Sequence, residues 1–323
     1  MSLRVWLGFG ISLVFLFFAF RGQDYGEIWQ ALQDAEYRWV LPSLVAYFIG
    51  VYLRSARWRY LLRSVSDVPT RSLFPVVVIG YLANNVLPLR AGELVRSYAL
   101  SVRFGVRKTT ALATIAVERL FDGLTMLLFM LVASLSISVT GRLQIVTLSA
   151  SAIFGVILTV LVLFVAIPGL REWSVRMVVR WLPGRVGPRV EEMALAFFSG
   201  LGILRQRSDL ARVGGLSVLA WLCEASMYLL IAQGFDLNIS PLAVLMVTAA
   251  ANLATLVPSS PGYVGPFEWG VSLVLVGALG KTEELALSYA IAVHAALYFP
   301  VVLLGLFFWW RQSFSWREMR RAA

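Results

Sequence analysis

Three ionisable residues, Glu118, Arg119 and Asp122, lie close together in an apolar run from Thr109 to Ile137. A charged side chain costs roughly 2.5–3.5 kcal/mol at the centre of a membrane-spanning helix, so such residues face the interior or a hydrated cavity and are paired. Glu118 and Asp122 share a helical face, and Arg119 can pair with Asp122 across one turn. Two interpretations stay open: a headgroup or coupling-ion site in a hydrated groove, and an ion pair that holds two helices together.

The single histidine, His294, lies in a second apolar run. When IAVERLFDGLTMLLF from Ile115 is aligned with IAVHAALYFPVVLLG from Ile291, Glu118 faces His294. His294 is therefore a candidate proton-sensitive partner, although a hydrogen-bonded structural role is the alternative. With one histidine and one cysteine, Cys223, the chain offers no His-rich or multi-cysteine metal site and no intramolecular disulfide, and we expect no metal or cofactor.

Two segments broken by proline and glycine, LANNVLPLRAGE and AANLATLVPSSPGYVGPFE, each precede one of these runs. A helix that starts after such a break points its positive dipole end at anionic groups, as a phosphate site requires. Candidate binding residues at the breaks are Arg90, Glu93, Arg96, Ser259, Ser260, Tyr263 and Glu268. Candidate structural residues, with the asparagines expected to cap broken backbone, are Asn84, Asn85, Pro88, Gly92, Asn252, Pro258, Gly262 and Gly265.

The composition excludes a water-soluble protein. Of 323 residues, 59% are hydrophobic and 14% charged, and the mean hydropathy is +0.78. We therefore expect an all-α, polytopic membrane protein with a single domain over residues 1–323. The net charge of +10 comes from arginines beside apolar runs, which suits anionic lipid headgroups rather than nucleic acid.

Six apolar runs predict six membrane crossings: Val5–Phe20, Trp39–Leu53, Thr109–Ile137, Ile145–Ile167, Val213–Ala232 and Leu285–Trp310. The first run ends in bulky phenylalanines, so we expect an uncleaved signal anchor. Arginine-rich loops predict that both termini are cytoplasmic in a prokaryotic inner membrane. Arg57, Trp58 and Arg59 follow the second run and are expected to anchor it at the membrane surface, and REWSVRMVVRWLP predicts an amphipathic helix.

The order of run, broken segment and run occurs twice, which predicts two repeats. Repeat one covers about 39–167, a cytoplasmic linker about 168–212, and repeat two about 213–310. Because the repeats start on opposite sides, a pseudo-two-fold axis in the membrane plane would relate them, each with a re-entrant helix pair. Substrates of such folds bind near the midplane, where the broken helices meet.

The segments NNVLPLRAGELVRSYAL, VERLFDGL, ARWRYLL and PSSPGYVGPFEWG resemble the membrane region of lysylphosphatidylglycerol synthases, also called flippase-like or UPF0104 proteins. The resemblance covers nearly the whole chain. It implies translocation of an aminoacylated phospholipid, or of another lipid such as a hopanoid, and it places Arg90, Glu93, Arg96, Glu118, Arg119 and Asp122 in the polar core of the family. No aminoacyl-transferase domain follows Ala323, so synthesis of a lysyl-lipid is not expected.

The leading hypothesis is a lipid flippase, not an enzyme, whose partners are anionic or aminoacylated phospholipids. Arginines at 90, 96 and 119 would engage phosphate, and carboxylates at 118, 122 and 268 would receive a cationic group or exchange protons. The alternatives are a membrane-embedded lipid transferase, a non-transporting accessory subunit, and an isoprenoid or hopanoid substrate. The sequence leaves open whether copies form a homo-oligomer.

Overall fold

The computed structural model describes residues 10–17, 21–63, 65–87, 91–137, 141–184, 186–188, 190–191, 194, 207–257 and 259–311. Every regular element in these ranges is a helix, as predicted. Pro88, Arg90 and Pro258 lie outside the described residues, as does most of the linker beyond residue 194. Of the expected signal anchor, only residues 10–17 are described, and they are helical.

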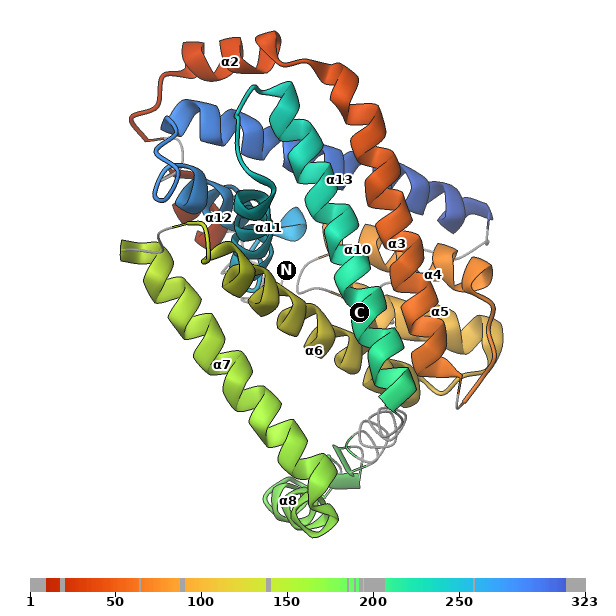
Figure 1. The fold of residues 1–323 in the computed structure, drawn as a ribbon. Coiled ribbons are helices and arrows are strands. Elements are labelled where there is room, and N and C mark those ends of the chain that lie inside the picture. Colours follow the sequence, from red (N-terminus) through yellow and green to blue (C-terminus); the bar gives the residue numbers. More distant parts are fainter. Residues whose placement is uncertain are drawn as a thin grey trace.

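The helices follow one another along the chain, and apart from the stretch between α8 and α10 their connections are short (Figure 1). They are α2 (Tyr25–Asp34), η1 (Tyr37–Trp39), α3 (Val40–Leu62), α4 (Thr70–Val86), α5 (Gly92–Phe104), α6 (Lys108–Ala133), α7 (Gly141–Ala166), α8 (Pro168–Arg180), α10 (Arg207–Gly234), α11 (Pro241–Ala254), η4 (Pro261–Tyr263), α12 (Pro266–Leu275) and α13 (Glu283–Arg311). The predicted amphipathic segment forms α8, with Trp173 and Met177 exposed.

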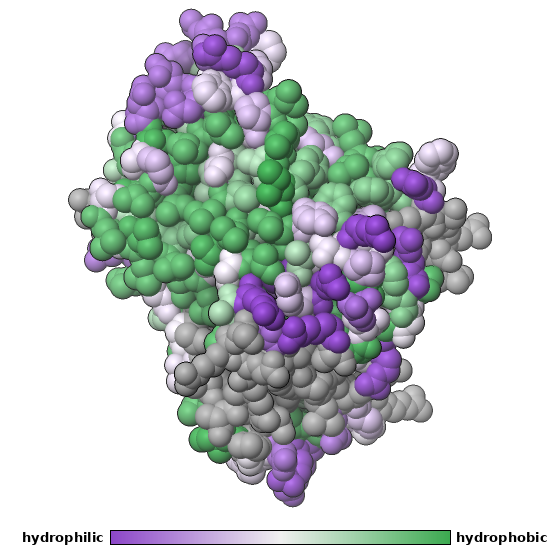
Figure 2. Space-filling view, turned by 45° about the vertical axis from the view of Figure 1, so that its right-hand side comes forward, coloured by the Kyte–Doolittle hydropathy of each residue, from purple (hydrophilic) through white to green (hydrophobic). Residues whose placement is uncertain are grey.

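The surface of the protein is apolar where a soluble protein would be polar. On α3, Leu41, Val45, Ile49 and Tyr52 recur at helical spacing and are all exposed. Figure 2 shows a broad hydrophobic face bounded above by the polar residues of the α2 region and below by a second polar zone. Apolar side chains outside and charged side chains inside are the arrangement that a lipid environment favours.

Three of the described helices are long and apolar enough to cross a membrane: Tyr37–Leu62, Asp209–Gly234 and Glu283–Arg311. Helices α6 and α7 each have 26 residues, which gives about 39 Å of helix. Such a length also exceeds the ~30 Å hydrocarbon core, but α6 carries four charged residues: Lys108, Glu118, Arg119 and Asp122. A multi-pass protein is confirmed, whereas six crossings and the orientation of the termini stay predictions.

Helices α3 and α10 form a long antiparallel pair through the centre (Figure 1). Glu36 N donates to Gly234 O at one end of the pair (2.8 Å), and Arg63 pairs with Asp209 at the other. The helices approach closely at Gly50, where a Cβ would lie 2.9 Å from Ala220 O. Helix α3 continues to Leu62, nine residues beyond the predicted end of its run at Leu53, so the RSARWRYLL segment is helical rather than a loop.

Two pairs of short helices pack against this centre. Helix α4 pairs with α5 and α11 with α12, and all four have between 10 and 17 residues. At 1.5 Å per residue none reaches ~30 Å, so each is too short to cross the hydrocarbon core straight. Small residues bring each pair together: a Cβ on Gly92 would lie 2.1 Å from Gly80 O, and one on Gly270 would lie 2.8 Å from Ala250 O.

Candidate functional site

Arg57 lies at the centre of a buried polar network between α3, α6 and α10. Its Nη1 donates to Asp122 Oδ1 (2.7 Å) and to Ser217 Oγ (2.8 Å), and its Nη2 lies 3.5 Å from Glu118 Oε1. The side chain is completely buried. Because an unpaired buried charge would be very costly, the stability of Arg57 and that of the two carboxylates depend on one another.

Glu118 connects this unit to α5. Its Oε2 accepts a hydrogen bond from Arg96 Nη2 at 2.8 Å, so Glu118 is shared by two arginines. The Arg96 guanidinium lies over the Trp58 ring, 4.1 Å from its centroid, and Trp58 Nε1 donates to Thr114 Oγ1 (3.0 Å). An aromatic face is a favourable neighbour for a desolvated guanidinium. The α4–α5 hairpin is therefore tied to α6 by a charge pair.

Asp122 is contacted from three helices. Besides Arg57, its Oδ1 accepts from Trp221 Nε1 of α10 (2.9 Å). Its Oδ2 lies 3.1 Å from Arg119 Nη2, one helical turn away, which confirms the predicted pair. Asp122 thus pairs with two arginines and accepts a hydrogen bond from one indole.

A neighbouring pair extends the network to the second half of the chain. Arg54 Nη2 donates to Glu224 Oε2 at 2.7 Å, and the Arg54 guanidinium lies 4.3 Å from the centroid of the Trp221 ring. Glu224 Oε1 accepts from Asn252 Nδ2 of α11 (3.2 Å). Asn252, expected to cap broken backbone, donates to this carboxylate and to the Thr248 carbonyl of its own helix.

Arg119 is the member of this network that reaches its surface. Its side chain is 40% exposed, whereas those of the other six charged members are at most 9% exposed: Arg54, Arg57, Arg96, Glu118, Asp122 and Glu224. The network sets four arginines against three carboxylates, and Glu93 lies close enough for its charge to act on Arg119. Arg119 Nε has no hydrogen-bond partner among the described residues. Glu118 and Asp122 are buried and Arg119 is partly exposed, so the hydrated groove expected around these three residues stays a prediction.

Three of the seven charged members of the network were not predicted as site residues: Arg54, Arg57 and Glu224. Arg57 and Trp58 were expected at the membrane surface, but both are buried, and only Arg59 is exposed, where it pairs with Asp67 (3.0 Å). Helix α3 continues past the predicted end of the apolar run, and the side chains of Arg57 and Trp58 on this extension are buried. Glu224 offered a usable signal, since a lone carboxylate in an apolar run requires a buried cation.

The first break is organised by its asparagines. Asn84 Oδ1 accepts from Gly92 N at 2.8 Å, so it caps the start of α5 as predicted. Asn85 O lies 3.5 Å from Tyr298 OH of α13. It also lies near Gly262 of the second break, as the packing of α4 against η4 requires. The two broken segments therefore meet, as expected for the centre of such a fold.

The second break is closed by the N-terminal helix. Ser260 N donates to Ser12 Oγ (2.8 Å), and Ser12 Oγ also hydrogen-bonds Ser260 Oγ at 2.8 Å. The Ser259 hydroxyl is buried and has no partner among the described residues. Tyr263 adopts a left-handed backbone conformation (φ 62°), which is uncommon for a residue with a side chain.

Glu268 and His294 form a second polar centre. Glu268 Oε1 lies 2.5 Å from His294 Nδ1, and Glu268 Oε2 accepts from Gly265 N (2.6 Å) at the start of α12. His294 Nε2 lies 2.7 Å from Gly262 O. The alignment that set His294 against Glu118 gives them equivalent places in their helices, but each has its own partners: arginines for Glu118, and Glu268 for His294.

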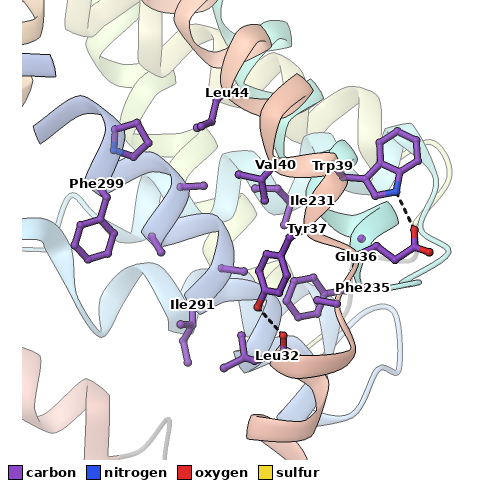
Figure 3. A pocket seen from close by; sticks show the side chains of 16 residues that line it. Leu32, Glu36, Tyr37, Trp39, Val40, Leu44, Ile231, Phe235, Ile291 and Phe299 are labelled. Carbon is purple, nitrogen blue, oxygen red and sulfur yellow. Dashed lines mark hydrogen bonds between the residues drawn. The ribbon is translucent and has the colours of Figure 1, made fainter. Parts of the chain in front are cut away.

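An apolar cavity of about 350 Å³ lies at the end of the α3–α10 pair where Glu36 meets Gly234, and no charged residue of the two polar centres lines it (Figure 3). Leu44 and Val40 of α3 line it on one side, and Ile231 of α10 and Phe299 of α13 on others. Its polar rim is Glu36, which accepts from Trp39 Nε1 (3.3 Å). Such a cavity suits a hydrocarbon chain rather than a charged group.

Metal chemistry finds no support in the described part of the chain. No group of three or more His, Cys, Asp or Glu side chains that could hold a metal ion occurs there. The carboxylates at 118, 122 and 224 are each engaged by arginine instead.

Long apolar helices around a buried charge network define a multi-pass helical membrane protein. A model of the lysylphosphatidylglycerol synthase TM region matches residues 5–305, so the chain belongs to that family. No solved structure matches the chain.

Curated relatives extend this assignment to archaea. A UPF0104 membrane protein of Methanothermobacter thermautotrophicus is 26% identical over 296 residues, 87% of each chain. Another, of Pyrococcus horikoshii, is 22% identical and covers 92% of this chain and 93% of its own. Glycosyltransferase AglD of Haloferax volcanii is 27% identical over 305 residues, which is 84% of this chain but 48% of that protein.

Proposed function

We propose that this protein moves a phospholipid or an aminoacylated phospholipid between the leaflets of the membrane. The observation that carries the proposal is the buried charge network with Arg119 at its edge. A lipid phosphate at Arg119 would compete with Asp122 for the same guanidinium (3.1 Å), so the headgroup can replace an existing ion pair rather than require a new one. That exchange lowers the cost of bringing a charged headgroup to bilayer depth.

The arrangement of the helices supports two inverted repeats, α3–α6 and α10–α13. Equivalent helices make equivalent contacts: α4 packs on α13 as α11 packs on α6, and α5 packs on α6 as α12 packs on α13. Helices α3 and α10, which occupy the same place in each repeat, are antiparallel, as a two-fold axis in the membrane plane requires. Both repeats contain one hairpin of short helices with a close glycine contact.

The direct test is lipid exchange in vesicles. The full chain is reconstituted with fluorescent phospholipids that carry anionic, zwitterionic or lysylated headgroups, and a membrane-impermeant quencher reports the outer leaflet. We expect the protein to equilibrate at least one headgroup class between leaflets well within the lifetime of the protein-free gradient. Equal exchange with and without protein for every headgroup would remove the proposal.

The apolar cavity gives the lipid tail a place beside the α3–α10 pair. Ala295→Phe adds a ring to a residue that lines it, so we expect slower lipid exchange, by about tenfold if seating of the tail costs ~1.4 kcal/mol more. Leu303→Phe is the matched control, because Leu303 is exposed on the same helix. Equal exchange rates in the two variants would show that the cavity takes no part in lipid exchange.

A lipid transferase is the second candidate, and the match to a protein named glycosyltransferase AglD favours keeping it. The match covers about half of that protein, so its name does not say which half acts. In this case the purified chain would convert a lipid acceptor and a donor into a stable product in detergent, where a transporter makes none. Chromatography of the lipids after incubation distinguishes the two.

A further inference from the structure

His294 of α13 is held between two oxygen atoms of the second broken segment. One is Gly262 O of η4, 2.7 Å from Nε2, and the other is Glu268 Oε1 of α12, 2.5 Å from Nδ1. The Phe267 ring covers the imidazole, with ring centroids 4.5 Å apart. Helix α13 is thereby tied to the loop and to the first turn of α12 through one side chain.

The hydrogen-bond inventory fixes how many protons this arrangement holds. A backbone carbonyl only accepts, so His294 Nε2 must carry a hydrogen. An ionised Glu268 also only accepts, so the contact with Nδ1 needs a further proton, on either the imidazole or the carboxyl group. Glu268 Oε2 is already occupied as an acceptor for Gly265 N (2.6 Å). The pair therefore holds one proton more than a carboxylate beside a neutral imidazole.

We propose that Glu268 and His294 form a proton-binding site that latches the second broken segment. Loss of the shared proton leaves a neutral imidazole with one N–H for two acceptors, so its contact with either Glu268 Oε1 or Gly262 O becomes repulsive and one of the two ties is lost. Proton uptake restores it. The latch stands on this geometry alone, whereas its use as the coupling step of transport rests on the proposed function.

Among the residues around His294, Glu268 is the partner that shares the proton. From α13, Tyr298 lies one turn further along and points its hydroxyl at Asn85 O of α4 (3.5 Å). From η4, Tyr263 adjoins the Gly262 carbonyl. Among the described residues in contact with the ring, Glu268 is the charged one.

The latch contacts a loop that has three residues with positive φ. Gly262 and Gly265 have φ values of 79° and 99°, and Tyr263 has 62°. This loop packs on α4 at the first break, and the hydroxyl of Ser259, two residues before η4, is buried. Release of the latch should therefore expose Ser259 while leaving the long helices in place.

The chain has a single cysteine, which makes this exposure measurable. Ser259→Cys in a Cys223→Ser background is reconstituted and labelled with N-ethylmaleimide between pH 5.5 and 8.5. Rates are divided by those of Ser136→Cys, an exposed position, to remove the effect of pH on the thiol itself. We expect the corrected rate to rise about tenfold toward alkaline pH, as for a local opening equilibrium.

Two variants on the same background give opposite expectations. In Glu268→Gln the amide can accept from Gly265 N and donate to Nδ1 without a titrating proton, so labelling should stay slow at every pH. In His294→Ala the tie is absent, and labelling should be fast at every pH. A corrected rate that does not change with pH in the parent protein, or an unchanged pH dependence in Glu268→Gln, overturns the latch. No lipid is measured, so either result is independent of the transport proposal.

Discussion

Replacing Arg57 by methionine is expected to destabilise the folded protein by about 3–5 kcal/mol. The side chain is fully buried and pairs with Asp122 and Glu118, so its loss leaves two carboxylates with less compensation in the interior. The free energy of unfolding in mixed micelles, titrated with SDS and followed by circular dichroism, measures the change.

Arg59→Met provides the matched control on the same helix. Arg59 is exposed and pairs with Asp67 at the surface, so its loss should cost less than about 1 kcal/mol. Neutralising Glu118 and Asp122 as well should not recover the loss, because Arg96 and Arg119 would then lose their carboxylate partners. Equal stability of Arg57→Met and Arg59→Met would show that Glu118 and Asp122 do not need the charge of Arg57.

Gly92→Ala is expected to separate α5 from α4 and to cost about 1–3 kcal/mol, as overpacking of a tight core does. A Cβ at residue 92 would lie 2.1 Å from Gly80 O and 2.5 Å from Asn84 Oδ1. The first of these atoms is backbone and cannot move without the helix. Because Arg96 is one turn further along α5, its pair with Glu118 should weaken as well.

The same SDS titration measures this variant, and Gly215→Ala serves as its control. Gly215 is in α10, and no atom lies within 4 Å of the position of its Cβ. Alanine there should be neutral or better, by up to about 1 kcal/mol from helix preference. A Gly92→Ala protein as stable as Gly215→Ala would contradict the close contact between α4 and α5.

Much of the fold follows from local sequence. Apolar length predicts the long helices, and proline with glycine predicts the breaks that make α4, α5, α11 and α12 short. The pair of Arg119 with Asp122 and the cap that Asn84 makes on Gly92 are local too, since they depend on helical spacing and on a nearby free amide.

The partners of the buried charges were not predictable in the same way. Arg57 and Asp122 are 65 residues apart, and Arg54 and Glu224 are 170 apart. Their pairing depends on the antiparallel register of α3 and α10, which no local pattern encodes. Hydropathy also ended the second run at Leu53, because an arginine looks like a loop residue until a carboxylate from another helix is known to meet it.

The partner of His294 shows a different limit. Alignment sets His294 against Glu118, yet it could not say that Glu118 pairs with α5 and His294 with α12. Arg96 on α5 and Glu268 on α12 supply opposite charges to equivalent places. The two residues that the alignment sets against each other therefore have partners of opposite charge.

Arg119, at the edge of the buried network, is proposed to contact the phosphate of a lipid in transit. Leaflet exchange by Arg119→Gln, compared with Arg59→Gln in the same vesicles, tests it most directly. Loss of one charged contact of ~1.4–2.8 kcal/mol predicts exchange about 10–100-fold slower in Arg119→Gln, with Arg59→Gln near the parent rate. Parent-like exchange in Arg119→Gln, with both variants folded, would contradict the account.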